Sequence, residues 1–214
     1  MNSSSREKTL GEALLGLLKI AYAVCVPFLL IFGVITLFAL SSNRAEANVG
    51  GLPLFSVIIW MAIIVPIALY LKGRKSRADQ VKSILKSLKS DSFFQPEKGN
   101  ETNSASSGKY FGIDARNGTL LYIHVIRRGQ VDVVGMTMAD WTQRELEDKK
   151  LRLYTKFVGL PCIEIASYES RRWYDTLGAM EHKRYNTPKP FGQYVSEHVG
   201  ALERENNIHI PKLA

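Results

Sequence analysis

Two long stretches without a charged side chain dominate the sequence. Ile20–Leu40 contains 21 residues and Leu52–Leu71 contains 20, and a helix needs about 20 apolar residues to cross a bilayer. Neither stretch has the polar face that a helix packed in a water-soluble protein shows every 3.6 residues. Because the second stretch follows so soon after the first, a cleaved signal peptide is disfavoured. We therefore predict that both are transmembrane helices, joined by a short outer loop at 41–51.

The orientation of this hairpin is predicted from the basic residues near the helix ends. The loop between the two stretches has only Arg44, whereas seven Lys or Arg follow the second stretch. Arg6, Lys8 and Lys19 precede the first stretch. Short segments rich in Lys and Arg stay on the cytoplasmic side of a membrane. We therefore expect a multi-pass membrane protein whose segment 1–19 and whose carboxyl-terminal part are both cytoplasmic.

Most of the positive charge of the chain lies directly after the second apolar stretch. The formal net charge is +8, and residues 72–89 hold seven cations and one Asp. Such a segment is attracted to anionic lipid headgroups, and it also fixes the topology. We therefore expect a basic patch at the membrane surface and no specific nucleic-acid partner. Its members are Lys72, Arg74, Lys75, Arg77, Lys82, Lys86 and Lys89.

Apolar residues recur at helical spacing between these cations. Val81, Ile84, Leu85 and Leu88 would share one face of a helix, and a helix with one apolar and one basic face is typical of segments that lie on a bilayer. We therefore predict a juxtamembrane amphipathic segment over 72–90.

Residues 91–108 are rich in Ser, Asn, Gly, Glu and Pro. A segment of this composition has too little apolar surface to offset the entropy lost on ordering. We therefore predict a flexible linker, in which Phe93 and Phe94 would serve as a transient anchor on lipid or protein.

An ordered domain is predicted over 109–214. Asn117-Gly118 lies between two apolar runs, which is a strong signal for a β-hairpin. Residues 137–149 are ambiguous, because Thr137 and Asp140 could open a short helix as a capping box, but a strand is favoured. The other predicted strands cover 110–114, 119–127, 131–136, 151–157 and 162–166.

Helical patterns follow the strands. Trp173, Leu177 and Met180 recur at helical spacing within 168–184, with Ser167 as the expected N-cap. A last helix is expected over 191–205, with a frayed tail after it. Strands followed by helices indicate an α+β domain in which a C-terminal helix covers an antiparallel sheet. Pleckstrin-homology domains have this order of elements, but a likeness of fold transfers no function.

No motif for nucleotide binding, zinc hydrolysis or paired-cysteine chemistry is present. Cys162 is expected to be a packed cysteine rather than a nucleophile served by His124, His182 or His198. The acidic residues around 145–148 are expected to form a solvated turn rather than a metal site. Arg127-Arg128 and Arg171-Arg172 would bind phosphate only if the fold brought them together. We therefore expect no enzyme, no catalytic residue, no cofactor and no metal.

Long segments of the chain resemble a known family. The start MNSSSREKTLGEALLGLLKIAYAVCVPFLLIFGVITLFAL, the second apolar stretch, and the block from YFGIDARNGTLLYIHV to YESRRWYDTLGAMEHKRY are similar to the entry-exclusion (surface-exclusion) proteins of I-type conjugative plasmids. The resemblance implies a bacterial inner-membrane protein that acts in the recipient cell. There it would block redundant transfer of a plasmid by recognising a cognate membrane component of the donor's conjugation apparatus.

Several questions stay open at the level of sequence. Recognition would involve the outer loop, the membrane helices, or partner segments that penetrate the recipient membrane. A homo-oligomer is compatible with the sequence. The alternative roles are a structural or adaptor subunit of a conjugation or secretion complex, and a membrane-tethered module that binds lipid or protein.

Overall fold

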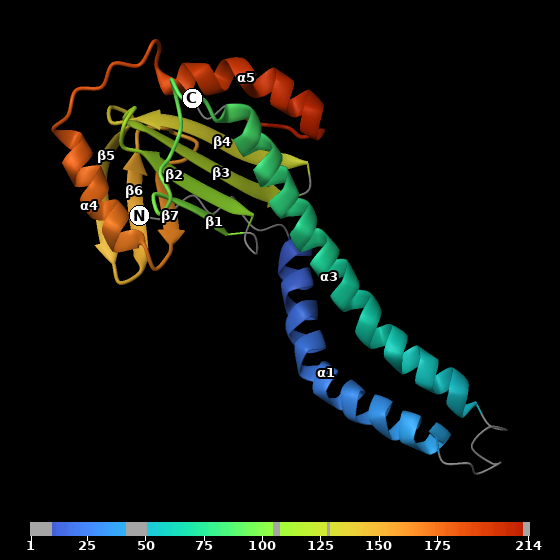
Figure 1. Cartoon of the computed structure of the whole chain (residues 1–214). Helices are drawn as coiled ribbons and strands as arrows, with labels where there is room; N and C mark the ends of the chain where they lie inside the picture. The colour runs from blue at the N-terminus through green and yellow to red at the C-terminus, as the bar shows by residue number, and fades with distance from the viewer. Residues whose placement is uncertain (1–9, 42–50, 105–107, 128, 212–214) are drawn as a thin grey trace. The chain divides into compact units, whose positions relative to one another are not determined.

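The structure is a computed structural model that describes residues 10–41, 51–104, 108–127 and 129–211. It contains two compact units, and the boundary between them falls within one helix, between Gly73 and Arg74. We call them the helical unit (Ser5–Gly73) and the sheet unit (from Arg74 onward). The elements, labelled in Figure 1, are α1 (Leu10–Ser41), α3 (Leu52–Leu88), β1 (Glu101–Ser104), β2 (Lys109–Asp114), β3 (Thr119–Arg127), β4 (Gln130–Thr137), β5 (Trp141–Glu147), β6 (Lys150–Thr155), β7 (Cys162–Ala166), α4 (Ser170–Glu181) and α5 (Phe191–Asn206).

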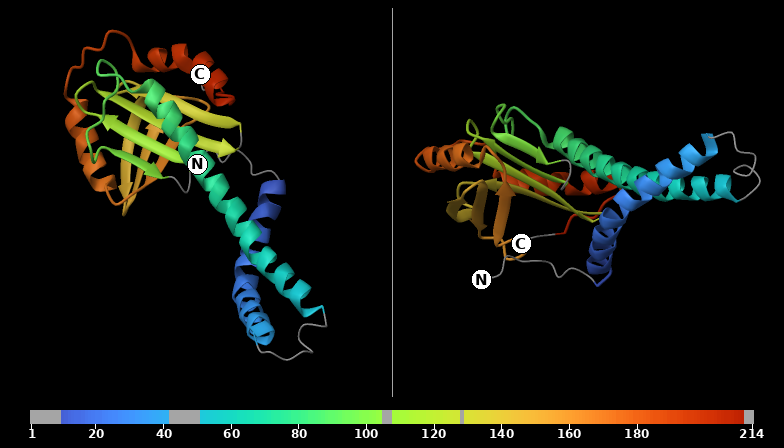
Figure 2. Two further views of the ribbon diagram at one scale, coloured as in Figure 1. Left: turned by 45° about the vertical axis from the view of Figure 1, so that its right-hand side comes forward. Right: turned by 90° about the horizontal axis from the view of Figure 1, so that it is seen from below.

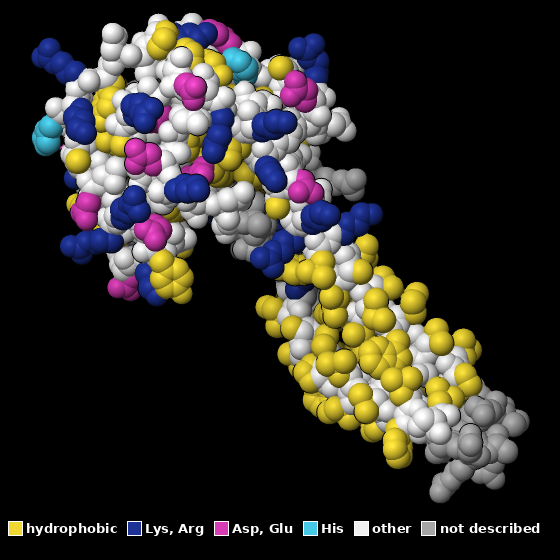
Figure 3. All heavy atoms as spheres, viewed as in Figure 1, with side chains coloured by type: hydrophobic (Ala, Val, Ile, Leu, Met, Phe, Trp, Pro, Cys, Tyr) yellow, Lys and Arg dark blue, Asp and Glu magenta, His cyan; other side chains and the backbone are white. Residues whose placement is uncertain are grey.

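The helical unit contains α1 and the first part of α3. Both helices are long and apolar enough, by length and composition, to cross a membrane, and apolar side chains cover most of the face that Figure 3 shows. Each helix extends beyond its predicted limits, since α1 begins at Leu10 and α3 ends at Leu88. Most of the predicted outer loop, residues 42–50, lies outside the described residues.

The sheet unit contains two antiparallel sheets rather than the single sheet that we predicted. One sheet has the strand order β1-β2-β3-β4 and the other has the order β5-β6-β7, and Figure 2 shows the two sheets from two directions. The Asn117-Gly118 turn joins β2 to β3 as predicted, with Gly118 at φ +70°. The ambiguous segment forms a strand, β5, and the Asp140 carboxylate accepts hydrogen bonds from the backbone N–H and the hydroxyl of Thr137 in the turn before it.

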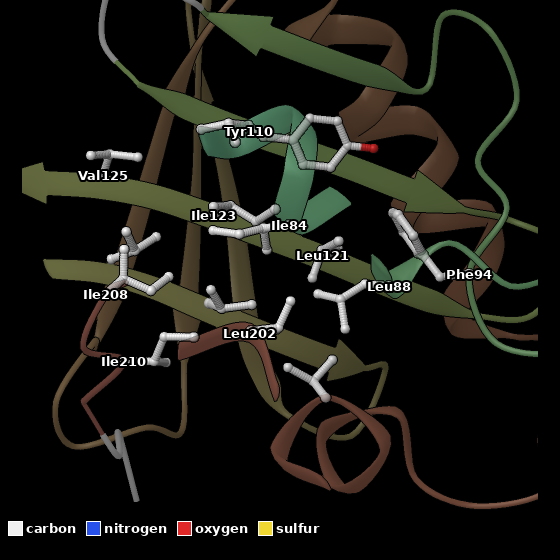
Figure 4. Close-up of a cluster of buried hydrophobic side chains, with 14 of the residues drawn as sticks. Ile84, Leu88, Phe94, Tyr110, Leu121, Ile123, Val125, Leu202, Ile208 and Ile210 are labelled. Carbon is white, nitrogen blue, oxygen red and sulfur yellow. The ribbon is translucent and has the colours of Figure 1, made fainter. Parts of the chain in front are cut away.

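Both faces of the four-stranded sheet are buried. Since successive side chains of a strand point to opposite faces, one strand contributes side chains to two hydrophobic clusters. Leu121 and Ile123 of β3 pack with side chains of α3 and α5 in one hydrophobic cluster, part of which is drawn in Figure 4. Leu120 and Tyr122 pack with side chains of β5, β6, β7 and α4 in a second cluster. The α+β class is therefore confirmed, with three helices, α3, α4 and α5, contributing to the core instead of one.

The last part of α3 contributes to the first of these clusters. Val81, Ile84 and Leu88 are fully buried against the four-stranded sheet. The prediction that this apolar face lies on a bilayer is therefore wrong, although the amphipathic helix itself is present. Helical spacing shows which residues share a face, and the sheet supplies the apolar surface that covers it.

The predicted flexible linker is also wrong over most of its length. Phe94 is fully buried in the same cluster as Leu88, so it is not a transient anchor. Glu101–Ser104 forms β1, an edge strand that pairs with β2 through the backbone and so needs no apolar side chains. Residues 105–107 lie outside the described residues.

Helix α4 confirms the helix predicted within 168–184, with Trp173, Leu177 and Met180 buried. Its N-cap residue is Glu169 rather than Ser167. The Ser167 hydroxyl instead accepts a hydrogen bond from the Glu169 backbone N–H.

Residues 207–211, which follow α5, are ordered rather than frayed. Asn207 ends the helix in a left-handed conformation with φ 49°. Ile208 and Ile210 then enter the first hydrophobic cluster, while His209 pairs in parallel with Gln130 at the free edge of β4. This short segment therefore both fills the core and covers the start of an edge strand.

Candidate functional site

The predicted basic patch lies along α3. Six of its seven cations are exposed and Arg77 is half-buried. A helix rises 1.5 Å per residue, so Lys75 lies about 6 Å beyond Leu71 along the axis and Lys82 about 16 Å beyond it. Fixed charges act over about 8–10 Å at physiological salt. Of the exposed cations, only those at 72–75 therefore lie within a Debye length of the end of the apolar stretch.

The two helices of the helical unit are joined by a hydrogen bond from a side chain to the backbone. The Tyr22 hydroxyl donates to the carbonyl oxygens of Ala62 at 3.1 Å and Ile63 at 2.9 Å. Pro66 lies four residues after Ala62 inside α3 and has no backbone N–H to donate to it. Tyr22 therefore satisfies a carbonyl that Pro66 leaves without its helical partner.

Small and polar side chains bring the same two helices together. The hydroxyls of Thr36 and Ser56 are buried and lie 3.2 Å apart. Gly33 lies so close to α3 that an added Cβ would be 3.4 Å from the Trp60 ring. Small residues let transmembrane helices approach closely, and interhelical hydrogen bonds hold them there. These contacts have the chemistry expected of a membrane hairpin.

The residues considered for catalysis are distributed over different elements. Cys162 is a free, half-buried cysteine of β7, and burial followed by the nearby Glu164 carboxylate raises the pKa of its thiol. His124 lies on β3, His182 caps the end of α4, and the His198 ring contacts the Tyr194 carbonyl on α5. A raised pKa keeps the thiol protonated, which is the opposite of what a nucleophilic cysteine requires.

The acidic residues at 145–148 are held by their own neighbours. The Glu145 carboxylate accepts a hydrogen bond from the Tyr154 hydroxyl at 2.8 Å, and Glu147 pairs with Arg152 at 2.7 Å. Asp148 occupies the turn between β5 and β6. Among the described residues, no group of three or more His, Cys, Asp or Glu is arranged to hold a metal ion.

The two arginine pairs have unrelated surroundings. The Arg127 guanidinium donates to the Gln130 side chain at 2.8 Å, next to the β3–β4 turn. Arg172 lies against Gly99, and Arg171 pairs with Asp175 along α4. Arg128 lies outside the described residues. The described contacts therefore do not join the pairs into one phosphate site.

A cleft that the sequence analysis missed opens between the two sheets at the edges formed by β1 and β7, which Figure 1 shows next to one another. Its volume is about 320 Å³, at the lower end of the range for small-molecule sites. The residues that line it come from both sheets and are Thr102, Ser104, Lys109, Tyr110, Phe111, Tyr122, Lys150, Glu164, Ile165 and Ala166.

The charged residues that line this cleft differ in whether they form ion pairs. Lys109 and Lys150 are half-buried, and neither forms an ion pair with any residue in the described part of the chain. Glu164, in contrast, is paired with Arg152 at 2.9 Å. Burial, followed by the nearby Asp132 carboxylate, raises the pKa of the Tyr122 hydroxyl.

A cross-strand row of polar residues leads into the cleft. Ser104 of β1 pairs with Lys109 of β2, Lys109 pairs with His124 of β3, and His124 pairs with Asp132 of β4. Directly paired residues share one face of a sheet. Because Lys109 lines the cleft, this row lies on the face turned toward the second sheet.

Comparison of the chain with protein-family models gives a match that covers nearly the whole chain. A family model described as "Exclusion-determining protein" matches residues 2–214. No curated protein and no solved structure matches the chain. The likeness to pleckstrin-homology domains therefore stays a prediction.

Proposed function

The chain belongs to the exclusion-determining protein family, and on this premise we propose that it blocks redundant conjugative transfer into the cell that makes it. The observation that carries the proposal is the family match over residues 2–214, which includes both apolar helices and the whole sheet unit. The family is defined by exclusion, a function without a chemical reaction of its own. The protein would act in the recipient, as a barrier to a plasmid that is already present.

The proposed location is the inner (cytoplasmic) membrane of a bacterium, with both termini in the cytoplasm. Two helices of sufficient length and apolarity support a two-span anchor. The exposed cations Lys72, Arg74 and Lys75 follow the second span directly, which supports a cytoplasmic carboxyl-terminal side and contact with anionic headgroups.

The proposed mode of action is recognition of a cognate membrane component of the donor's conjugation apparatus. The helical unit is the part best suited to meet a membrane partner, because its outward face is formed by large exposed apolar side chains such as Phe28, Phe32 and Phe55. Its inward face is occupied by contacts such as Thr36 to Ser56. A partner helix could therefore bind the outward face without separating the two helices.

The proposal is tested by expressing the chain alone in recipient cells. Transfer of a plasmid carrying the same exclusion system should fall by orders of magnitude, while an unrelated conjugative plasmid enters at its normal frequency. Unchanged entry of the related plasmid, with the protein detected in the inner-membrane fraction, would reject the proposal. A defect seen only when the gene is deleted from the donor would instead identify an adaptor subunit of the transfer complex.

A chimaera locates the recognition surface. In it, residues 5–73 are replaced by an unrelated two-span hairpin and the chain from Arg74 onward is kept. We expect the chimaera to insert in the membrane and to lose exclusion. The matched control keeps residues 5–73 and replaces only the exposed side chains Val158 and Tyr168 of the sheet unit by Ser. Exclusion by the chimaera at the wild-type level would place recognition in the sheet unit.

A further inference from the structure

We propose that the cleft between the two sheets binds a phosphate group through Lys109 and Lys150. This site is independent of the exclusion partner, and the inference goes beyond the proposed function. It starts from two half-buried lysine residues that line one cleft and form no ion pair with the described residues. Partly burying a cation is unfavourable unless an anion or hydrogen-bond acceptors offset the lost hydration.

Both lysines line the cleft because of the strands that carry them. Lys109 begins β2 and has the same strand parity as Phe111, so both face the second sheet. Lys150 begins β6, beside Ala166 at the end of β7, and has the opposite parity to Leu151, so it lies on the outer face of the second sheet at the β7 edge of the cleft. Each sheet therefore contributes one cation to the same opening, and the two are 41 positions apart in the sequence.

The anionic side chains near the cleft leave these two cations available. Glu164, the only carboxylate that lines the cleft among the described residues, is committed to Arg152 at 2.9 Å. Asp132 is two strands away from Lys109 in the cross-strand row, with His124 between them. Glu147, directly opposite Lys150 on β5, is paired with Arg152 at 2.7 Å. Among the described residues that line the cleft, the charges outside any ion pair are therefore those of the two lysines.

Hydroxyl donors complete the site. Thr102, Ser104 and Tyr122 line the cleft with the two lysines. Burial and the Asp132 charge raise the pKa of the Tyr122 hydroxyl, so it keeps its proton. A phosphate monoester has three strong acceptor oxygens and a charge between −1.5 and −2 at neutral pH. Two ammonium groups with several hydroxyls match that charge and that number of acceptors.

The same phosphate chemistry occurs on a lipid headgroup and on a soluble phosphomonoester. The cleft opens between two edge strands, β1 and β7, so a phosphate can enter while the rest of its molecule stays outside. The proposal therefore specifies the phosphate group, and the experiment distinguishes its two sources.

The experiment uses the full chain and measures how fast lysine amines are acetylated, residue by residue, by mass spectrometry. In maltoside micelles, which contain no phosphate, added inorganic phosphate should slow the acetylation of Lys109 and Lys150 at least threefold. Lys156 is exposed and does not line the cleft, so its rate should not change. In the second arm, the chain is placed in phosphatidylcholine nanodiscs with and without phosphatidic acid.

The two arms identify the source. Protection by inorganic phosphate alone indicates a soluble phosphomonoester, and protection that requires phosphatidic acid indicates a lipid headgroup. Protection of neither lysine in either arm would overturn the proposal, as would equal protection of Lys156. Because this measurement uses the wild-type chain, it does not depend on the folding of a variant.

Charge-removing variants give an independent measurement. Lys109→Met or Lys150→Met should each lower the affinity for the protecting phosphate, measured by calorimetry, about tenfold. Lys156→Met is the matched control, with the same change in charge and an expected affinity within twofold of the wild type. Circular dichroism checks that each variant is folded. Wild-type affinity in a folded Lys109→Met, Lys150→Met double variant would overturn the proposal.

Discussion

The hydroxyl of Tyr22 on α1 donates to the Ala62 carbonyl that Pro66 leaves without a helical hydrogen bond on α3. In water such a carbonyl would be hydrated, whereas in hydrocarbon an unsatisfied backbone group costs several kcal/mol. The proline and the tyrosine, 44 positions apart in the sequence, therefore act as a pair. The Tyr22 hydroxyl also donates to the Ile63 carbonyl of α3, so it links the two helices.

This pair gives a double-mutant prediction. Tyr22→Phe should destabilise the hairpin by about 0.5–1.7 kcal/mol, the range for interhelical hydrogen bonds in membranes. Pro66→Ala restores the N–H that can bond to Ala62, so in that background Tyr22→Phe should cost less. Steric trapping of the hairpin in lipid bicelles measures both values. The control is Tyr70→Phe, an exposed tyrosine; an equal cost of Tyr22→Phe in both backgrounds would contradict the link.

The packing of α3 on the sheet predicts a large effect on folding. Ile84→Ala should lower the free energy of unfolding by about 2–5 kcal/mol, because the side chain is fully buried and leaves a cavity. Lys86→Ala, exposed on the same helix, should change it by less than about 0.5 kcal/mol. Denaturant unfolding followed by tryptophan fluorescence compares the two. If Ile84 instead lay on a bilayer, its replacement would weaken vesicle binding and leave unfolding unchanged.

Two glycines with positive φ separate backbone strain from contact with a neighbour. An added Cβ at Gly118 (φ +70°) would lie 2.2 Å from the Tyr185 ring, whereas at Gly129 (φ +81°) nothing lies within 4 Å. Gly129→Ala should cost about 1 kcal/mol, from its conformation alone. Gly118→Ala should cost clearly more, because the ring must also move. Equal melting temperatures for the two variants would show that Tyr185 does not pack on this turn.

From the environment of Tyr110 we predict that the free energy of unfolding falls in alkali. Burial, followed by the hydrogen bond to Glu101 and the charge of that carboxylate, raises the pKa of its hydroxyl well above the unfolded value near 10. The stabilisation is therefore complete below pH 10 and is lost as the pH rises above it, with a slope of up to about 1.4 kcal/mol per pH unit for this tyrosine. In Tyr110→Phe, unfolding free energies measured between pH 9 and 11 should fall less steeply by that amount. Identical slopes would contradict the assignment.

The basic patch predicts a difference between its two ends. Replacing the three cations nearest the apolar stretch by Gln should increase the fraction of molecules whose carboxyl-terminal reporter lies outside the cytoplasm, because the charge bias near the helix end sets orientation. The matched control replaces three cations farther along α3 and should keep the wild-type orientation. The first set is Lys72, Arg74 and Lys75, and the second is Lys82, Lys86 and Lys89. Equal effects of the two sets would show that the distance along the helix does not matter.

The sequence predicted elements better than it predicted their partners. Asn117-Gly118 and the spacing of Trp173, Leu177 and Met180 are local signals, and the structure contains the corresponding turn and helix. The local spacing of apolar residues also predicts the buried face of α3, but it does not predict what that face packs against. An apolar stripe packs on lipid or on a sheet for the same reason, which is the removal of apolar surface from water. Only the fold brings Ile84 against the four-stranded sheet.

The remaining errors have similar causes. The sequence of β1 is Glu-Thr-Asn-Ser, which carries little strand signal. It is ordered by pairing with β2, with help from the Tyr110 hydroxyl bonded to Glu101 at 2.7 Å. The cleft was missed because Lys109 and Lys150 come to line one cleft only through tertiary structure. The one available signal was parity, which places Lys109 on the same strand face as Phe111.

The burial of Val81, Ile84, Leu88 and Phe94 decides where the chain can be cut. A protease that cleaved within 91–108 would remove the helix from the sheet and leave apolar residues of β3 facing water. The released piece would aggregate or be degraded. A usable water-soluble fragment must therefore begin near Arg74, and exchanging the anchor for another one requires a junction upstream of that residue.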